Sequence, residues 1–144
     1  MGEEHREKIW IAKEGRARYD ALQERARSLA LRIAALADEF PRTPSGKVFA
    51  DQLVRCATST ACNHRSARRA RSKAEWIAKL GIVEEEADEM IFWLGMSRDK
   101  GFLEDRLCTE LTIEANEILS IIVASIKTAR ANNRIEKKSR TVRL

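Results

Sequence analysis

Turn-forming residues are scarce in this chain of 144 residues, which contains two prolines and six glycines. Alanine, leucine, isoleucine, arginine, glutamate and lysine dominate instead, and this composition favours an all-helical fold. No apolar run approaches the roughly 20 residues of a membrane-spanning helix. The charged N-terminus, MGEEHREK, lacks the features of a secretory signal. We therefore expect a cytoplasmic protein without a membrane segment.

Cysteine and histidine are also rare, and their spacing excludes several classes of site. Cys56, Cys62 and Cys108 form no C-x-x-C pair, and only two histidines could join them as metal ligands. This odd, dispersed set predicts reduced, mostly buried thiols without a disulfide, metal or other cofactor. The Glu-x-x-His motif of di-metal helical bundles is missing. Because His64 has no visible nucleophile partner, we expect no catalytic residue and no enzyme activity.

Four segments carry apolar residues at alternating spacings of three and four, the pattern of an amphipathic helix. They span approximately residues 19–40, 44–71, 73–98 and 103–131. The apolar seam of the third segment consists of Trp76, Leu80, Val83, Ala87, Met90 and Leu94. Each segment is long enough for one helix of a small domain.

Capping residues mark the boundaries between these segments. Thr43 can cap the second helix with Pro44 in its first turn, and Ser72 with Glu75 matches a capping box for the third. A single helix over residues 44–98 would be about 80 Å long, too long for a domain of this size. A reversal near Ser72 is therefore predicted, and Gly101 is expected at the next turn.

Four helices of comparable length joined by short turns predict an all-α, up-down-up-down four-helix bundle. We place this bundle at residues 19–132. A charged N-terminal extension, residues 1–18, precedes it, and its Ile9-Trp10-Ile11 patch either extends the first helix or frays. Residues 133–144 are rich in lysine and arginine, so we expect a basic, poorly ordered tail there.

Positive charge is densest in the second helix and the turn that follows it. The candidate nucleic-acid-binding residues are Arg55, Arg65, Arg68, Arg69, Arg71 and Lys73. The expected inner face of the same helix consists of Leu53, Cys56, Thr60, Asn63 and Ala67. Cations gathered on one side of an element are typical of a surface that binds a polyanion. A solvated helix face would show the same pattern.

The fourth helix is apolar nearly all round, and its segment LSIIVASI contains no charged residue. A helix on the outside of a monomeric bundle should have one polar face. The second apolar stripe, Leu119, Val123 and Ile126, therefore predicts an interface between subunits. The alternative is a central helix contacted on all sides within one chain.

Two further groups of residues have simpler explanations than a site. The glutamates of the third helix lie mostly off its apolar seam, and we expect a solvated face that pairs with arginines of the second helix or of another subunit. Trp76 and Trp93 could stack on bases. Aromatic residues at helical spacing more often belong to a core or an interface, which is our expectation here.

Several short motifs occur together in a characteristic order. They are Thr58-Ser59, Asn63, Arg65, Ala67, Arg71-Ser72, Lys79-Leu80-Gly81, Glu86-Ala87-Asp88-Glu89, Trp93-Leu94, Ala115-Asn116-Glu117 and Ala124-Ser125-Ile126-Lys127-Thr128-Ala129. In this order they resemble the 23S rRNA intervening-sequence protein family, whose members are small four-helix bundles. The similarity covers approximately residues 19–132.

The resemblance implies a ring-like homopentamer encoded within or near inserts in ribosomal RNA genes. It also implies a relation to the accessory protein of diversity-generating retroelements, a basic pentamer that binds nucleic acid and a reverse transcriptase. His64 and Ser66 stand where relatives often carry a tyrosine and a glutamate. Loss of that acid makes this face more basic than is usual for the family.

We therefore expect a non-catalytic, oligomeric protein that binds RNA or DNA through backbone contacts with little sequence preference. The alternative is an oligomeric scaffold that binds a protein partner, such as a reverse transcriptase, through the same basic surface. Both functions use cations on a convex face, so the sequence does not separate them.

Overall fold

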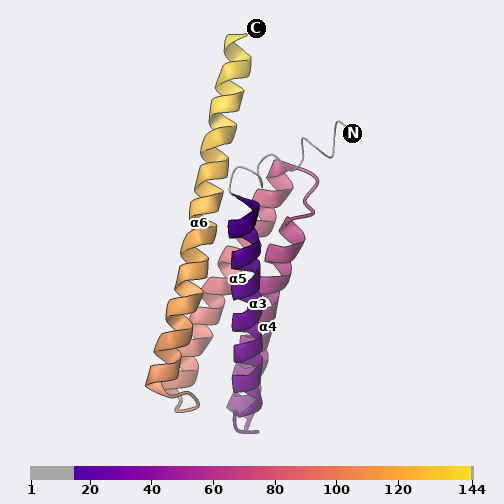
Figure 1. Cartoon of the computed structure of the whole chain (residues 1–144). Helices are drawn as coiled ribbons and strands as arrows, with labels where there is room; N and C mark the ends of the chain where they lie inside the picture. The colour runs from indigo at the N-terminus through magenta and orange to yellow at the C-terminus, as the bar shows by residue number, and fades with distance from the viewer. Residues whose placement is uncertain (1–14, 144) are drawn as a thin grey trace.

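The computed structural model describes residues 15–143, which form four helices and contain no strand. In chain order the helices are α3 (Arg16–Asp38), α4 (Pro44–Ala67), α5 (Lys73–Asp99) and α6 (Asp105–Val142). Successive helices alternate in direction, so that the start of α3 lies at the same end of the bundle as the end of α4 (Figure 1). The expected all-α fold with four helices is confirmed.

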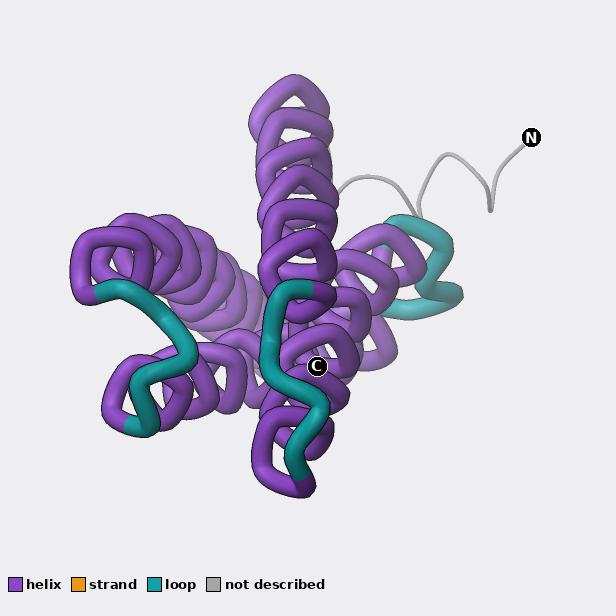
Figure 2. The backbone as a smooth tube through the Cα atoms, turned by 90° about the horizontal axis from the view of Figure 1, so that it is seen from below, coloured by secondary structure: helices purple, strands orange, loops and turns teal. Residues whose placement is uncertain are grey.

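Helix packing is uneven around the bundle. The neighbours α3 and α4, α4 and α5, and α5 and α6 pack along much of their lengths, whereas α3 and α6 touch little (Figure 2). The predicted seam of α5 is buried: Trp76, Leu80, Val83, Ala87, Met90 and Leu94 are all at most 1% exposed. All of these side chains except Ala87 lie in one apolar core with residues from the other three helices.

The predicted caps form, with one difference in detail. The Thr43 hydroxyl accepts a hydrogen bond from the Gly46 N–H at 3.1 Å, and the Ser72 hydroxyl accepts one from the Glu75 N–H at 3.1 Å. The Glu75 carboxylate accepts from the Arg71 N–H at 2.8 Å, one residue earlier than a standard capping box requires. Gly101 has a φ of +83°, a conformation that glycine adopts without a Cβ clash.

The fourth helix is longer than its apolar pattern indicates. We expected it to end near residue 131 and to be followed by a poorly ordered tail, but α6 continues to Val142. That expectation was wrong because residues 132–142 contain no proline or glycine and hold four lysine or arginine residues and one glutamate, residue types that favour a helix. With 38 residues, α6 is about 57 Å long, and its C-terminal part extends beyond the other helices (Figure 1).

Two other boundaries differ from expectation. Helix α4 ends at Ala67 instead of residue 71, because the chain must turn before the Ser72 cap. Phe40 follows α3 and is buried outside the helix. The Ile9-Trp10-Ile11 patch lies outside the described residues.

The inner face of α4 contains a histidine in place of the expected asparagine. Leu53, Cys56 and Thr60 are buried as predicted. His64, four residues after Thr60, continues the face and is 1% exposed, whereas Asn63 is half-buried and donates to the Ser59 carbonyl at 2.9 Å. Our assignment of Asn63 to the buried face was therefore wrong by one position.

Within residues 15–143, none of the helices carries an apolar stretch of the length and hydropathy that crossing a membrane requires.

Candidate nucleic-acid interface

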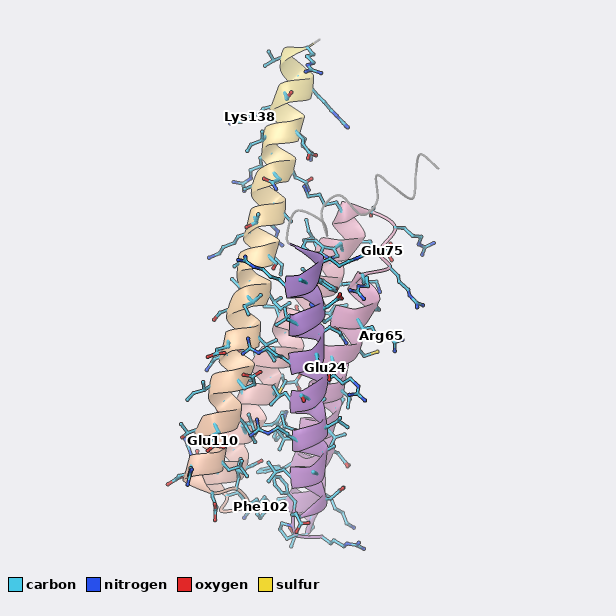
Figure 3. All side chains as sticks on the ribbon, in the orientation of Figure 1. Glu24, Arg65, Glu75, Phe102, Glu110 and Lys138 are labelled. Atoms are coloured by element: carbon cyan, nitrogen blue, oxygen red, sulfur yellow. The ribbon has the colours of Figure 1, made fainter. Side chains whose placement is uncertain are left out.

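The alternating helix directions bring cation-rich segments of all four helices to one end of the bundle (Figures 1 and 3). These segments are residues 15–22, 60–80 and 125–143, and we call them together the basic end. Its fifteen cations are Arg16, Arg18, Arg65, Arg68, Arg69, Arg71, Lys73, Lys79, Lys127, Arg130, Arg134, Lys137, Lys138, Arg140 and Arg143. Only three acids, Asp20, Glu75 and Glu136, accompany them. The other described residues contain nine cations and fifteen acids, so charge is strongly separated along the bundle axis.

All three acids of the basic end are already used in ion pairs. Asp20 pairs with Arg68, Glu75 with Arg71 at 3.7 Å, and Glu136 with Lys73 at 4.0 Å. The other twelve cations of the basic end have no ion pair among residues 15–143. A dense group of unpaired cations lowers the free energy of an anion bound there. It also attracts anions from a distance.

Local structure exposes the cations of the turn between α4 and α5. Helix α4 ends after Ala67, and the chain then reverses before the Ser72 cap. Arg65, Arg69 and Arg71 are exposed, and Figure 3 shows Arg65 on the outer side of α4 near this end. This arrangement leaves Arg65 and Arg69 available to bind a ligand.

Five of the six predicted nucleic-acid-binding residues lie at the basic end, and Arg55 does not. Its guanidinium donates to Glu86 at 3.0 Å and to Glu89 at 2.5 Å, both on α5. The hydrogen bond with Glu89 is the largest cause that raises the pKa of Arg55. The same bond is the largest cause that lowers the pKa of Glu89. Arg55 therefore joins α4 to α5, as we expected for the glutamates of the third helix, and its charge is locally balanced.

One group of side chains has the spacing of a metal site. Ligand atoms of Cys56, Glu86 and Glu89 lie within 4.8 Å of one another. However, the Arg55 guanidinium donates to all three, including the Cys56 Sγ at 3.2 Å. Burial raises the pKa of the Cys56 thiol to about 12. A protonated thiol beside a bound guanidinium is a poor metal ligand, so we assign no metal to these residues.

Arg68 belongs to a packed cluster with Tyr19 and His64. Its guanidinium carbon lies 5.4 Å from the Tyr19 ring centre, and the Tyr19 ring stacks on His64 with centres 4.2 Å apart. The Tyr19 hydroxyl donates to the His64 carbonyl oxygen. Burial lowers the pKa of His64 to about 4. Arg68 is thus a cation with a structural role as well as an exposed position.

The three predicted interface residues of α6 have different environments. Leu119 and Val123 are half-buried, whereas Ile126 is 3% exposed within the core of the chain. The large apolar side chains that α6 exposes are instead Ile113 (54%) and Ile121 (41%) along the bundle, and Ile135 and Val142 near its C-terminal end. Our choice of Ile126 was therefore misplaced, because this position faces the other helices of the same chain.

Sequence reasoning recognised the cations after Asn132 as a basic tail but missed the contributions of α3 and of Lys127 and Arg130 of α6 to the basic end. Arg16 and Arg18 begin α3, and the helical continuation of α6 carries Arg134 and Lys138, the latter well beyond the bundle (Figure 3). The sequence could have indicated these contributions, because alternating helix directions bring the start of one helix to the same end of the bundle as the end of the next. A charge map drawn helix by helix would have found them.

Comparisons with known proteins agree with this architecture. Residues 20–124 match the family model described as 23S rRNA-intervening sequence protein. A crystal structure of a protein with unknown function from the S23 ribosomal protein family of Bacteroides thetaiotaomicron VPI-5482 is similar, with a TM-score of 0.69 and 26% sequence identity. The alignment covers 74% of this chain and 98% of that one. No curated protein matched the chain. Since the family model spans most of its length, the chain belongs to the 23S rRNA-intervening sequence protein family.

Proposed function

We propose that this protein is a non-catalytic nucleic-acid-binding protein whose basic end contacts the phosphates of RNA or DNA. The observation that carries the proposal is the group of twelve cations at that end without an ion pair in the described chain. Lysine and arginine side chains on a convex surface bind phosphates, and phosphate contacts carry little sequence information. Binding should therefore tolerate many sequences.

The most direct test measures affinity as a function of salt. Fluorescence anisotropy with labelled RNA and DNA of unrelated sequences should give similar dissociation constants at each salt concentration. Each phosphate contact releases counterions, so log affinity should fall with log salt by about 0.9 per contact on a duplex and about 0.7 on a single strand. Absence of binding at about 50 mM salt, where such contacts are strong, would refute the proposal and leave a protein-binding scaffold as the better function.

A charge-matched pair of variants tests the location. Changing Arg65 and Arg69 to glutamine removes two cations of the basic end that have no ion pair. Changing Arg27 and Arg32 to glutamine removes two cations outside it, which pair with Glu24 and Glu110. The first double variant should bind more weakly with a flatter salt dependence, because each phosphate contact accounts for about 0.7 to 0.9 of the slope. Equal effects of both variants would mean that net charge, and not the basic end, drives binding.

We also propose self-association through the exposed side of α6. Ile113 and Ile121 are exposed apolar residues two helical turns apart on this helix, and a surface of this kind is typical of a contact between subunits. Light scattering should then give a mass several times 16.4 kDa, and the pentamer implied by the sequence resemblance would give five times that mass. Ile113→Glu should lower the mass, whereas Val48→Glu, at an exposed position on α4, should leave it unchanged. A monomeric wild-type protein would exclude self-association.

A further inference from the structure

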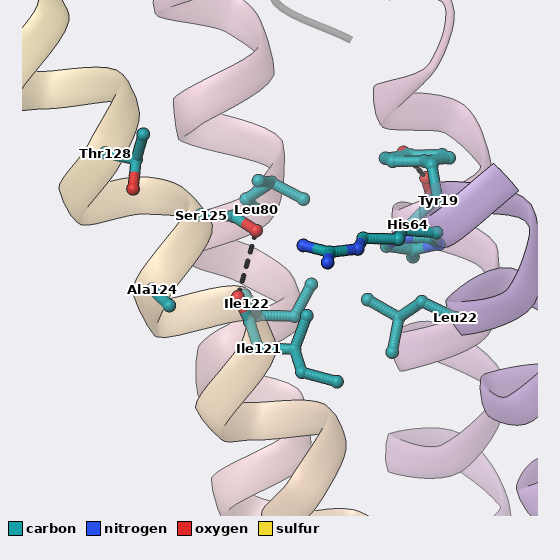
Figure 4. A pocket seen from close by; sticks show the side chains of 10 residues that line it. Tyr19, Leu22, His64, Leu80, Ile121, Ile122, Ala124, Ser125 and Thr128 are labelled. Carbon is teal, nitrogen blue, oxygen red and sulfur yellow. Dashed lines mark hydrogen bonds between the residues drawn. The ribbon is translucent and has the colours of Figure 1, made fainter. Parts of the chain in front are cut away.

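A pocket of about 400 Å³ lies between α3, α4, α5 and α6 beside the basic end (Figure 4). It is lined by Arg18, Tyr19, Leu22, His64, Leu80, Ile121, Ile122, Ala124, Ser125 and Thr128. Its size is within the usual range of small-ligand sites. None of these residues is an acid, so the pocket repels no anion.

Helices α3 and α6 touch little, and the pocket lies between residues of these two helices, with α4 and α5 beside it. Nearer their middle, Arg25 of α3 donates to both carboxylate oxygens of Glu114 of α6, at 2.9 and 2.8 Å. These bonds, chiefly, raise the pKa of Arg25. Arg32 and Glu110 lie 3.9 Å apart further from the basic end. Arg25 also pairs with Glu117 of α6. None of the residues in these three ion pairs lines the pocket, and the small side chain of Ala124 leaves space on its α6 side.

One wall of the pocket contains a buried hydrogen-bond acceptor without a partner. Gln23 donates its amide N–H to the Ala61 carbonyl at 3.3 Å, which leaves its oxygen to accept from His64 Nδ1 at 2.6 Å. His64 Nδ1 therefore carries the proton, and Nε2 has a lone pair. No described atom donates to that Nε2. A buried polar atom without a partner is costly and indicates a missing donor.

Arg18 gives the pocket a cation at an exposed position. Its side chain is exposed and has no ion pair among the described residues. His64 Nε2 has almost no accessible surface, so a ligand can reach it only if a neighbouring side chain moves. Arg18 can move without breaking an ion pair. The pocket thus combines apolar walls, the Arg18 cation and one acceptor that a moving side chain could uncover.

We propose that this pocket holds one unstacked base of a single-stranded nucleic acid whose phosphates lie on the basic end. The inference rests on the function proposed above and specifies the form of nucleic acid that the site prefers. Every nucleobase has an N–H donor for His64 Nε2 and an apolar face for Leu22, Leu80 and Ile122. The Arg18 guanidinium would bind the phosphate of the nucleotide next to this base. Because all four bases meet these needs, the pocket favours single strands without selecting a sequence.

The experiment compares a single-stranded RNA of about 12 nucleotides with its duplex, using the full-length chain. Ser125→Phe fills the pocket from a half-buried position and removes no charge. Thr109→Phe is the matched control, because both hydroxyls donate to the carbonyl four residues earlier at 2.9 Å and Thr109 lies outside the pocket. Ala124→Phe is a second filling variant from an exposed position.

Wild type should bind the single strand more tightly than the duplex. Both filling variants should lose roughly 5- to 150-fold in single-strand affinity, the range measured for one stacked base, and keep their duplex affinity within about twofold. The control variant, Thr109→Phe, should keep both its single-strand affinity and its duplex affinity. Equal losses on both RNAs, unchanged single-strand affinity or a wild type that prefers duplex would each overturn the pocket assignment while leaving the proposed function intact.

Two other results separate the remaining explanations. If the filling variants lower the mass measured by light scattering and leave RNA binding unchanged, the pocket receives a second copy of the chain and the base assignment is wrong. If wild type binds no RNA of either form, the proposed function fails together with this inference.

Discussion

Mild acid should destabilise this bundle through a single buried side chain, His64. Burial lowers its pKa to about 4 in the folded protein, from an ordinary value of 6.5. Between these two values the unfolded chain binds a proton that the folded chain does not. The stability is therefore complete above about pH 6.5 and is lost as the pH falls towards about 4.

The expected size of this loss can be worked out from the two pKa values. Between about pH 8 and about pH 5, the free energy of unfolding should fall by about 2 kcal/mol. The two carboxylates whose pKa is shifted, Glu89 and Glu114, contribute little in this window. The pKa values of Glu89 and Glu114 are lowered by their arginine partners, so the stability that they contribute is lost at lower pH. The window above pH 5 therefore isolates the histidine.

Urea unfolding at several pH values, for wild type and His64→Asn, measures this effect. The asparagine amide can replace ring Nδ1–H as the donor to Gln23 and does not titrate in this range. The variant should show a much flatter dependence on pH, whatever its stability at pH 8. The control is His5→Asn, at a position outside the described residues, which should keep the slope of wild type. If His64→Asn lost as much stability as wild type on acidification, the assignment to His64 would be refuted.

Three other changes have expected outcomes. Ser72→Ala removes the cap bond to the Glu75 N–H and should lower the free energy of unfolding by about 1 kcal/mol; an unchanged urea midpoint would contradict the capping role. Ile126→Glu should prevent cooperative thermal unfolding, monitored by circular dichroism, because it buries an unpaired charge in the core; a normal melting curve would show that this position is accessible. Truncation after Asn132 removes five cations and Glu136, and the salt dependence of RNA binding should flatten by at least about 0.7; an unchanged slope would mean that the end of α6 makes no phosphate contact.

Periodicity predicted the helices and most of the core correctly. The α5 seam from Trp76 to Leu94 is buried at every predicted position, because a spacing of three and four leaves little choice of which face turns inward. Caps at Thr43 and Ser72 also formed as expected. These features depend on local sequence and are therefore visible in it.

Features that depend on three-dimensional neighbours could not be predicted in the same way. Arg55 and Arg65 look alike in the sequence, yet Arg55 meets Glu86 and Glu89 across the α4–α5 contact and Arg65 meets no acid among the described residues. The burial of His64 in place of Asn63 depends on how α4 is rotated about its own axis. A small rotation decides which of these two adjacent residues faces the core. The helical continuation of α6 over residues 132–142 was missed because apolar periodicity ends where the helix leaves the bundle.

The separation of charge along the bundle makes each chain an electric dipole with a preferred direction of approach. A polyanion would meet the basic end first, and alignment before contact raises association rates at low salt. Copies standing side by side with parallel axes would bring like charges together, so assembly would cost electrostatic energy that a bound polyanion removes. Linkage then requires reciprocity: if nucleic acid strengthens assembly, assembly strengthens the affinity for nucleic acid by the same factor.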